Sequence, residues 1–234
     1  MRKFDYTFLK KISVPADIMN SATSIYEMKA KAELRRTDFA DVFSAMESVA
    51  KIQSVKISNA IKWIIMTDKR IRDIVNKSTV PQGHNELEIA GYRDALDLIH
   101  SSYSDIPFSE KSILELHRML LQPSGDDLAG KYKTEDNFII ETDREGVRSV
   151  RFTTVPASET AFAMEQLILA YHAAYSEAEI NPLMLITCVI LDLLCIHPFR
   201  NVNGRMSRLL SLLLMYKSGF NAGKCVSIEE QINT

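Results

Sequence analysis

Residues 183–196 are apolar on almost every side, and they constrain the fold more than any other stretch of the chain. Asp192 is the one charged residue among them. The preceding pair, Asn181-Pro182, is typical of a helix start, because a proline at the first helical position loses no hydrogen bond. An apolar helix of this kind is buried in a protein core, and it is too short to cross a membrane. The sequence therefore predicts helices packed around this segment.

A second helix is predicted to begin near Asn203. Its apolar residues follow the i, i+3, i+4, i+7, i+8 spacing of one helical face. They are Met206, Leu209, Leu210, Leu213 and Leu214. Gly219 followed by Phe220 predicts a left-handed helix end with a hydrophobic contact. The first helix is expected to end at His197, because the residue before Pro198 is disfavoured in the helical conformation.

The corner between these two helices concentrates positive charge. Arg200, Arg205 and Arg208 lie there, and residues 193–228 contain no Asp or Glu. The start of the second helix adds free backbone N–H groups and the positive end of the helix dipole. His197, whose side chain titrates near neutral pH, lies beside these cations. The corner is therefore predicted to bind an anion such as phosphate, with a base next to it.

The stretch from His197 to Arg208 resembles the signature of the Fic family, H-P-F-x-[D/E]-G-N-G-R-x-x-R. Seven fixed positions match, namely His197, Pro198, Phe199, Asn203, Gly204, Arg205 and Arg208. At roughly one in twenty per position, a chance match of this length is rare, so the motif is specific. The resemblance covers about residues 50–230. It implies an all-α Fic fold, a helical bundle around a central buried helix with a small β-hairpin flap.

The resemblance also implies an activity, the transfer of AMP from ATP to a Ser, Thr or Tyr hydroxyl of a target protein. His197 would be the catalytic base, and Phe199 would pack below the loop and fix its shape. The ATP phosphates would be held by four residues, Asn203, Gly204, Arg205 and Arg208. The last of these would reach the γ-phosphate. Gly204 fits AMP transfer, since the kinase-like Doc branch has Lys at this position.

Two positions depart from the signature. Asn201 stands where the family has an acidic residue that helps to hold Mg²⁺, so a neutral oxygen makes it a weak metal candidate. Val202 stands where the family has Gly, and a β-branched residue resists the positive φ that Gly allows. Either the loop differs locally or its anion site is poorer. Both departures weigh against full activity.

Residues 54–59 have a counterpart in the inhibitory helix of many Fic proteins, [S/T]-x-x-x-E-[G/N]. Ser54 and Asn59 fit this pattern, whereas Ser58 occupies the glutamate position. In the family that glutamate pairs with the second motif arginine, here Arg208, and blocks productive ATP placement. Serine cannot form this ion pair, so the motif is degenerate. The alternative is a helix end with small polar residues.

A β-hairpin is predicted over about 138–152, where β-branched and aromatic residues flank a polar turn. The resemblance assigns Phe138, Ile139 and Ile140 to a flap that pairs with the backbone of the target protein by strand addition. The alternative is a structural hairpin without a ligand.

The 234 residues divide into two predicted regions. An N-terminal helical region covers 1–104 and carries the degenerate inhibitory helix, and a Fic core covers 105–234. Within the first region, Thr37 is predicted to cap a helix over 37–57, and a less regular helix follows over 60–76. A capping box at Ser227 starts a helix with little room to form, so the C-terminus is expected to be truncated.

Composition limits the remaining possibilities. A net charge of −2 gives no general case for a nucleic-acid polymer or a membrane as partner. The three cysteines lack metal-ligand spacing, and Met1-Arg2-Lys3 is not followed by the apolar run of a signal peptide. The cytoplasm is the expected location, and the sequence leaves open whether the chain forms a homo-oligomer.

Three functions are consistent with these observations. The first is a protein adenylyltransferase with reduced or metal-altered activity. The second is related Fic phosphate chemistry, such as transfer of another nucleotide-linked group or removal of AMP. The third is an inactive Fic domain that binds nucleotide or a partner and regulates it. Asn201 discriminates between them, because it replaces the acidic residue of the active signature.

Overall fold

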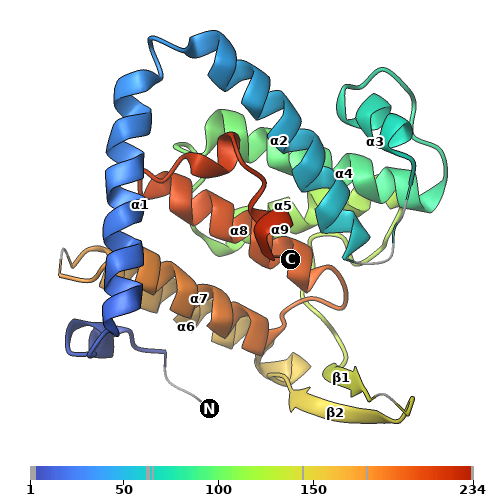
Figure 1. Ribbon diagram of the computed structural model, residues 1–234. Helices are drawn as coiled ribbons and strands as arrows, with labels where there is room; N and C mark the ends of the chain where they lie inside the picture. Colours follow the sequence, from blue (N-terminus) through green and yellow to red (C-terminus); the bar gives the residue numbers. More distant parts are fainter. Residues whose placement is uncertain (1–3, 62–63, 65, 144, 178, 233–234) are drawn as a thin grey trace.

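The computed structural model describes residues 4–61, 64, 66–143, 145–177 and 179–232. Helices and one hairpin make up this part of the chain (Figure 1). In chain order the elements are η1 (Thr7–Lys10), α1 (Ala16–Arg35), α2 (Ala40–Ala60), α3 (Asp68–Val75), α4 (Gly83–Ser102), α5 (Glu110–Leu121), η2 (Gln122–Ser124), β1 (Phe138–Thr142), β2 (Arg148–Thr153), α6 (Ala157–Tyr175), α7 (Pro182–Ile196), α8 (Asn203–Lys217), η3 (Ala222–Lys224) and α9 (Ile228–Ile232). The predicted fold class, a helical bundle with a small hairpin, is confirmed.

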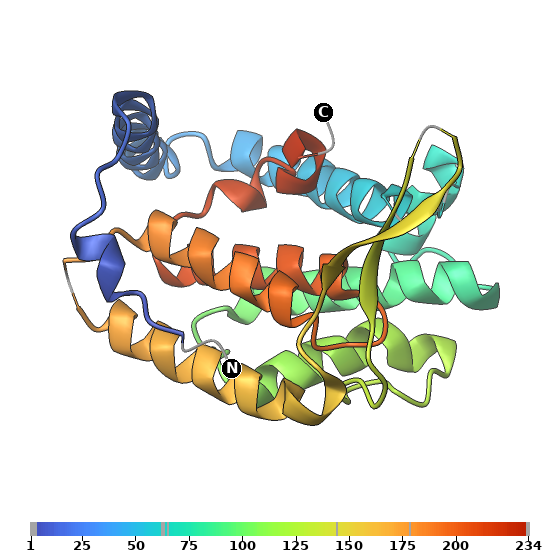
Figure 2. The same ribbon diagram turned by 90° about the horizontal axis from the view of Figure 1, so that it is seen from below.

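α7 and α8 pack against each other at the centre, with α6 beside α7 and α4 beside α8 (Figure 2). The side chain of Asn181 accepts a hydrogen bond from the backbone N–H of Leu183 (2.9 Å), which confirms the predicted start of α7. One face of α7 is buried through Leu185, Val189, Leu193 and Ile196. Burial is not uniform around this helix, since Leu191 is 58% exposed.

The predicted inner face of α8 is confirmed, because all five of its apolar residues are fully buried. The helix ends in a Schellman motif. The N–H of Gly219 bonds to the carbonyl of Tyr216 (2.9 Å), and the N–H of Phe220 bonds to that of Met215 (2.8 Å). Gly219 has φ +81°, the left-handed value expected at this position.

The N-terminal helices differ from the prediction at their boundaries. Thr37 does not cap a helix, because the N–H of Phe39 bonds to the carbonyl of Arg35 and closes this turn onto the end of α1. α2 therefore begins only at Ala40. The helix predicted over 60–76 is interrupted, since α2 ends at Ala60 and α3 begins at Asp68. Residues 62, 63 and 65 lie outside the described part of the chain.

β1 and β2 form the predicted hairpin, paired antiparallel from Phe138 with Thr153 to Thr142 with Arg148. A register irregularity between Ile139 and Ile140 marks a bulge. Every residue of β2 is exposed, so neither face of the strand is packed into the core. The hairpin projects beside the ends of α6 and α7 (Figures 1 and 2). Arg144, in the predicted turn, lies outside the described residues.

Among the described residues, no helix has both the length and the apolar character that a membrane span requires.

Candidate active site

His197 ends α7 in the left-handed conformation, with φ 53° and ψ 59°. Its Nδ1 lies 3.3 Å from the carbonyl oxygen of Leu194. A carbonyl only accepts hydrogen bonds, so Nδ1 carries the proton of the neutral ring and Nε2 is the basic nitrogen. Burial lowers the pKa of His197, the hydrogen bond to Leu194 opposes this, and the charge of Lys133 lowers the pKa further. The imidazole is therefore held in its proton-accepting form at neutral pH.

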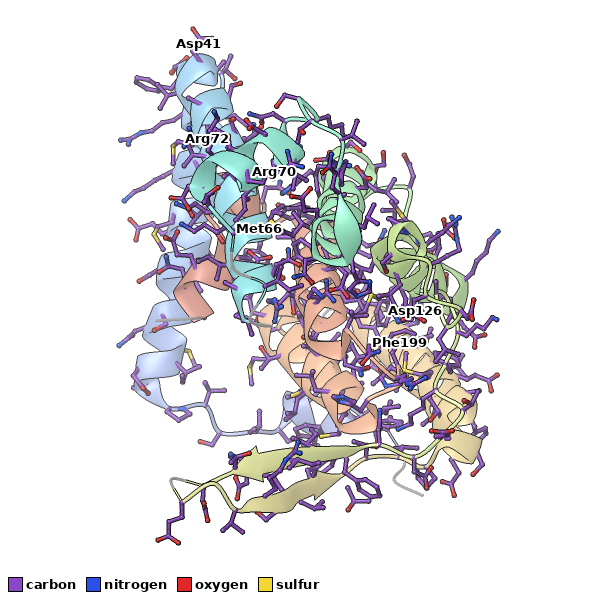
Figure 3. The ribbon with its side chains drawn as sticks, turned by 90° about the vertical axis from the view of Figure 1, so that its right-hand side faces the viewer. Asp41, Met66, Arg70, Arg72, Asp126 and Phe199 are labelled. Atoms are coloured by element: carbon purple, nitrogen blue, oxygen red, sulfur yellow. The ribbon has the colours of Figure 1, made fainter. Side chains whose placement is uncertain are left out.

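Phe199 fixes the loop that follows. Its side chain is fully buried and stacks on the ring of His117, with 3.8 Å between centroids and 7° between planes. Figure 3 labels Phe199, which lies among the helices. The side chain of Asn203 accepts from the N–H of Phe199 (3.0 Å) and donates to its carbonyl (2.7 Å). The loop is thus closed on itself by one amide and anchored from below by one aromatic pair.

His117 is the partner that the sequence did not single out. Its Nδ1 accepts a hydrogen bond from the backbone N–H of Gly130 (3.0 Å), so this nitrogen is unprotonated. Burial lowers the pKa of His117 to about 4. A neutral imidazole can stack face to face with Phe199 without a buried charge. In the sequence, the one signal is that His117 falls at the spacing of the apolar residues Ile113, Leu116 and Leu120.

Val202 adopts the conformation that a β-branched residue resists, with φ +62° and ψ 14°. The loop therefore does not differ locally to avoid it, which was one of the two alternatives. The side chain is 4% exposed, so burial of its apolar surface compensates for the strained backbone. The N–H of Met206 bonds to the Val202 carbonyl (2.9 Å), which makes Val202 the residue from which α8 starts.

A hollow of about 250 Å³ lies over this corner. The described residues that line it are Ile61, His197, Arg200, Asn201, Val202, Asn203, Gly204, Arg205 and Arg208. The structure thus brings together the predicted base and every residue predicted to hold phosphate or metal. The lining does not include Phe199, Ser54 or the hairpin residues Phe138, Ile139 and Ile140.

Arg205 is 1% exposed, and its guanidinium is already paired. Nη2 donates to Glu88 Oε2 on α4 (2.6 Å), and Nη1 donates to Asn59 Oδ1 on α2 (3.2 Å). Burial lowers the pKa of Arg205, and the carboxylate of Glu88 opposes this. The third nitrogen, Nε, is buried and has no hydrogen-bond partner among the described residues. Arg205 therefore joins three helices and retains one guanidinium nitrogen without a partner in the described part of the chain.

Arg208 contacts the residue at the degenerate inhibitory position. Its Nε and Nη2 donate to Ser58 Oγ (3.1 and 3.0 Å), and Nη2 also donates to the Ser58 carbonyl (3.0 Å). The C-terminal end of α2 thus contacts an arginine that lines the hollow. Ser58 supplies no negative charge there, so Arg208 keeps its full charge toward the hollow.

A second buried chain of hydrogen bonds lies behind Ser58. Tyr92 on α4 donates from its hydroxyl to Glu229 Oε1 on α9 (2.7 Å), and the Ser227 hydroxyl donates to Glu229 Oε2 (3.1 Å). Burial and the Glu229 charge raise the pKa of Tyr92, and the Ser58 hydroxyl acts in the opposite direction. The short helix α9 is therefore tied to the same region as Arg208.

The hairpin is attached to the motif loop at its base. The side-chain amide of Asn137, which precedes β1, donates to the Phe199 carbonyl (3.0 Å). The N–H of Lys133 donates to the Pro198 carbonyl (2.9 Å). Sequence reasoning missed both residues and Glu88, although a charged residue within the buried face of α4 is itself a signal of an internal partner.

The lining of the hollow does not fit Mg²⁺ well. None of the described residues that line it carries a carboxylate, and Asn201 offers one neutral oxygen. Glu88, the acid that contacts Arg205, is engaged in an ion pair with it. No group of three or more His, Cys, Asp or Glu side chains suited to a metal ion occurs in the described residues. The site is cationic, and its donors suit an anion.

Comparison with known proteins gives a match to the Fic/DOC family over residues 107–215. Protein adenylyltransferase fic-1 of Caenorhabditis elegans is 28% identical over 194 residues, which is 80% of this chain and 33% of that protein. Protein adenylyltransferase Fic of Nematostella vectensis is 26% identical over 178 residues, which is 73% of this chain and 39% of that protein. The chain therefore spans well under half the length of both relatives.

Solved structures share the fold. A Fic domain containing signaling protein from Bacteroides thetaiotaomicron superposes with a TM-score of 0.70 at 20% identity, covering 84% of this chain and 72% of that one. A Fic family protein from Desulfovibrio desulfuricans gives a TM-score of 0.72 at 17% identity, covering 88% and 59% of the two chains. At this identity the likeness concerns the arrangement of helices and hairpin only.

Proposed function

This chain is a member of the Fic/DOC family through residues 107–215, and we propose that it transfers AMP from ATP to a Ser, Thr or Tyr hydroxyl of a target protein. One observation carries the proposal. His197, with Nε2 free to take a proton, lines the same hollow as Arg208 and the N-terminal turn of α8. Both curated relatives are named protein adenylyltransferases, which supports the same reaction class.

In the proposed reaction, the hydroxyl oxygen of the target attacks the α-phosphorus of ATP. His197 Nε2 takes the hydroxyl proton. The new bond joins the target oxygen to the α-phosphorus, and the bond from that phosphorus to the bridging oxygen breaks. Pyrophosphate leaves with the electron pair, and the target carries AMP. Since the pKa of His197 is lowered, the base is available at neutral pH without prior loss of a proton.

The phosphates would be met by backbone and cations at the start of α8. The N–H groups near Gly204 and the helix dipole favour an anion, and Arg208 is directed by Ser58 to the edge of the hollow. Arg200 also lines the hollow. Arg205 would contribute its unpaired Nε while Glu88 and Asn59 hold the rest of the guanidinium. These donors would position the triphosphate and stabilise charge that develops in the transition state.

The hairpin would hold the target. Both strands are largely exposed, so their edges can accept an extended segment of another protein. Phe138 and Ile140 are half exposed and would contact its side chains. Asn137 fastens this hairpin to the loop that carries His197, so a segment paired there would be held close to the base.

A regulatory domain without transfer activity is the second candidate. It is favoured by the absence of a carboxylate among the described lining residues and by the pairing of Arg205 with Glu88. Related chemistry, removal of AMP or transfer of another nucleotide-linked group, uses the same base and anion site. The experiment must therefore separate transfer, removal and binding.

The test is incubation of the protein and a mixture of acceptor proteins with ATP labelled at the α- or the γ-phosphorus, with Mg²⁺ or Mn²⁺. AMP transfer predicts protein-bound label from the α-position only, lost in His197→Ala. Label that persists in His197→Ala contradicts the proposal. Label that is absent from the wild type and gained in Asn201→Asp favours the regulatory domain. Release of AMP from a previously modified acceptor identifies removal.

A further inference from the structure

Lys133 is a buried lysine in the segment between α5 and β1, 4% exposed. Its ammonium group donates three hydrogen bonds, to Asn137 Oδ1 (2.8 Å), Thr154 Oγ1 (2.9 Å) and the Ile196 carbonyl (3.2 Å). An ammonium group has three donors, so all are used. Burial of a lysine is rare because its charge loses hydration. A buried lysine therefore requires hydrogen-bond acceptors that replace the lost water.

The contacts of Lys133 surround the proposed base. Its side chain binds the carbonyl of Ile196, the residue before His197, and its backbone N–H binds the carbonyl of Pro198, the residue after it. Its other two acceptors stand at the base of the hairpin. Asn137 directly precedes β1, and Thr154 directly follows β2. One side chain thus joins the end of α7 to both strands of the hairpin.

We propose that Lys133 is a positioning residue, which fixes His197 between the motif loop and the base of the hairpin and holds a positive charge near the imidazole. The inference rests on the proposed function, in which His197 is the base. Lys133 does not line the hollow, so it would act on His197 and on the hairpin rather than on the nucleotide.

The charges around His197 determine the direction in which its pKa is shifted. A positive charge nearby disfavours the imidazolium, and the charge of Lys133 lowers the pKa of His197. Among the described residues, the other charged side chains that line the hollow with His197 are Arg200, Arg205 and Arg208, which are cations as well. Asp136 faces Lys133 and favours its charged form, while burial lowers the pKa of Lys133 to about 8. Lys133 is therefore still protonated where an imidazole titrates.

The direct test is the titration of His197 by NMR, on the full chain labelled at the imidazole carbon and with its signal assigned by loss in His197→Gln. In Lys133→Met, which keeps the length and removes the charge, we expect the pKa of His197 to rise by about 0.5 to 1. Lys133→Gln retains donors for the hairpin base and is the variant to use if Lys133→Met does not fold. Lys131→Met removes a charge from an exposed position in the same segment and is the matched control.

An unchanged pKa of His197 in a folded Lys133 variant overturns the inference. An equal rise in Lys131→Met also overturns it, because the effect would then be general charge rather than position. The titration needs neither nucleotide nor target, so it does not depend on AMP transfer. If transfer is observed, the pKa of the base in its pH–rate profile should move to higher pH in Lys133→Gln, by the same amount as the pKa of His197 in the titration. If the wild type transfers no AMP but the pKa of His197 rises in the Lys133 variants as expected, the proposed function is refuted and the role of Lys133 is not.

Discussion

Arg208 donates to the hydroxyl of Ser58 from two nitrogens, at 3.0 and 3.1 Å, and thereby links the end of α2 to the first turn of α8. The two residues are 150 positions apart. Because Ser58 is fully buried, this contact has a fixed geometry. The side chain at position 58 therefore decides how much of the Arg208 charge is available to an anion in the hollow.

Replacing Ser58 by Glu should weaken ATP binding. A carboxylate at this position would pair with Arg208 and compete with phosphate, so we expect the Kd for a non-hydrolysable ATP analogue to rise about tenfold. Isothermal titration calorimetry measures it. Ser58→Gln is the control for steric effects, because Gln has the size of Glu but no charge. Equal affinities of the Glu and Gln variants would mean that charge at position 58 does not govern the site.

Glu88→Gln should destabilise the protein strongly. It leaves the guanidinium of Arg205, which is 1% exposed, without its counter-charge, at a cost of about 3 kcal/mol. Urea unfolding measures the change in the free energy of unfolding. Glu115→Gln, which breaks the surface pair with Arg118, should cost below about 1 kcal/mol. Similar losses in both variants would show that the Arg205 pair is not an internal cross-link.

The strained backbone at Val202 predicts that glycine and alanine substitutions reverse their usual order of stability. At φ +62° an alanine keeps the clash of its Cβ with the backbone, whereas glycine does not. Val202→Gly should therefore be more stable than Val202→Ala by about 1 kcal/mol, although glycine normally weakens a folded chain. Val189, buried in the middle of α7, supplies the comparison. There the alanine variant should be the more stable, and the same order at both positions would contradict a left-handed Val202.

The buried imidazole of His117 predicts a dependence of stability on pH. Its pKa is about 4 in the folded protein against an ordinary value of 6.5, so the unfolded chain binds more protons between these values. The free energy of unfolding should fall as pH drops from about 6.5 to about 4. His100, with a similarly lowered pKa, contributes to the same window. His117→Phe keeps an aromatic partner for Phe199 and should make this dependence shallower by about a third to a half.

The control is Lys131→Gln, a change of charge at an exposed position. Its pH dependence should equal that of the wild type. Chemical denaturation at several pH values between about 4 and 7 gives the comparison. A wild-type slope in His117→Phe would mean that His117 is not neutral beneath the loop.

Local rules were sufficient for the central helices. The cap at Asn181, the buried face of α8 and the Schellman end at Gly219 each depend on neighbours within a few residues, and all three predictions are confirmed. Thr37 failed because the turn after α1 is closed by the backbone of Phe39, which competes with side-chain capping. A short-range pattern does not report this competition.

The composition of the site was predictable where one contiguous motif supplies it, from His197 to Arg208. The partners of that motif were not, because Glu88, His117 and Lys133 reach it from other helices and loops, at sequence separations that no periodicity records. Val202 is instructive in a different way. The conformational preference of valine left open a locally different loop or a poorer anion site, and the structure keeps the left-handed backbone because burial of the side chain compensates for it.

The most direct measurement is a crystal structure of the protein soaked with a non-hydrolysable ATP analogue. We predict that the triphosphate occupies the hollow, with its α-phosphate facing His197 Nε2, its β-phosphate at the first turn of α8 and its γ-phosphate within reach of Arg208. An analogue bound elsewhere, or one in the hollow with its α-phosphate turned away from His197, would contradict the assignment of His197 as the base for AMP transfer.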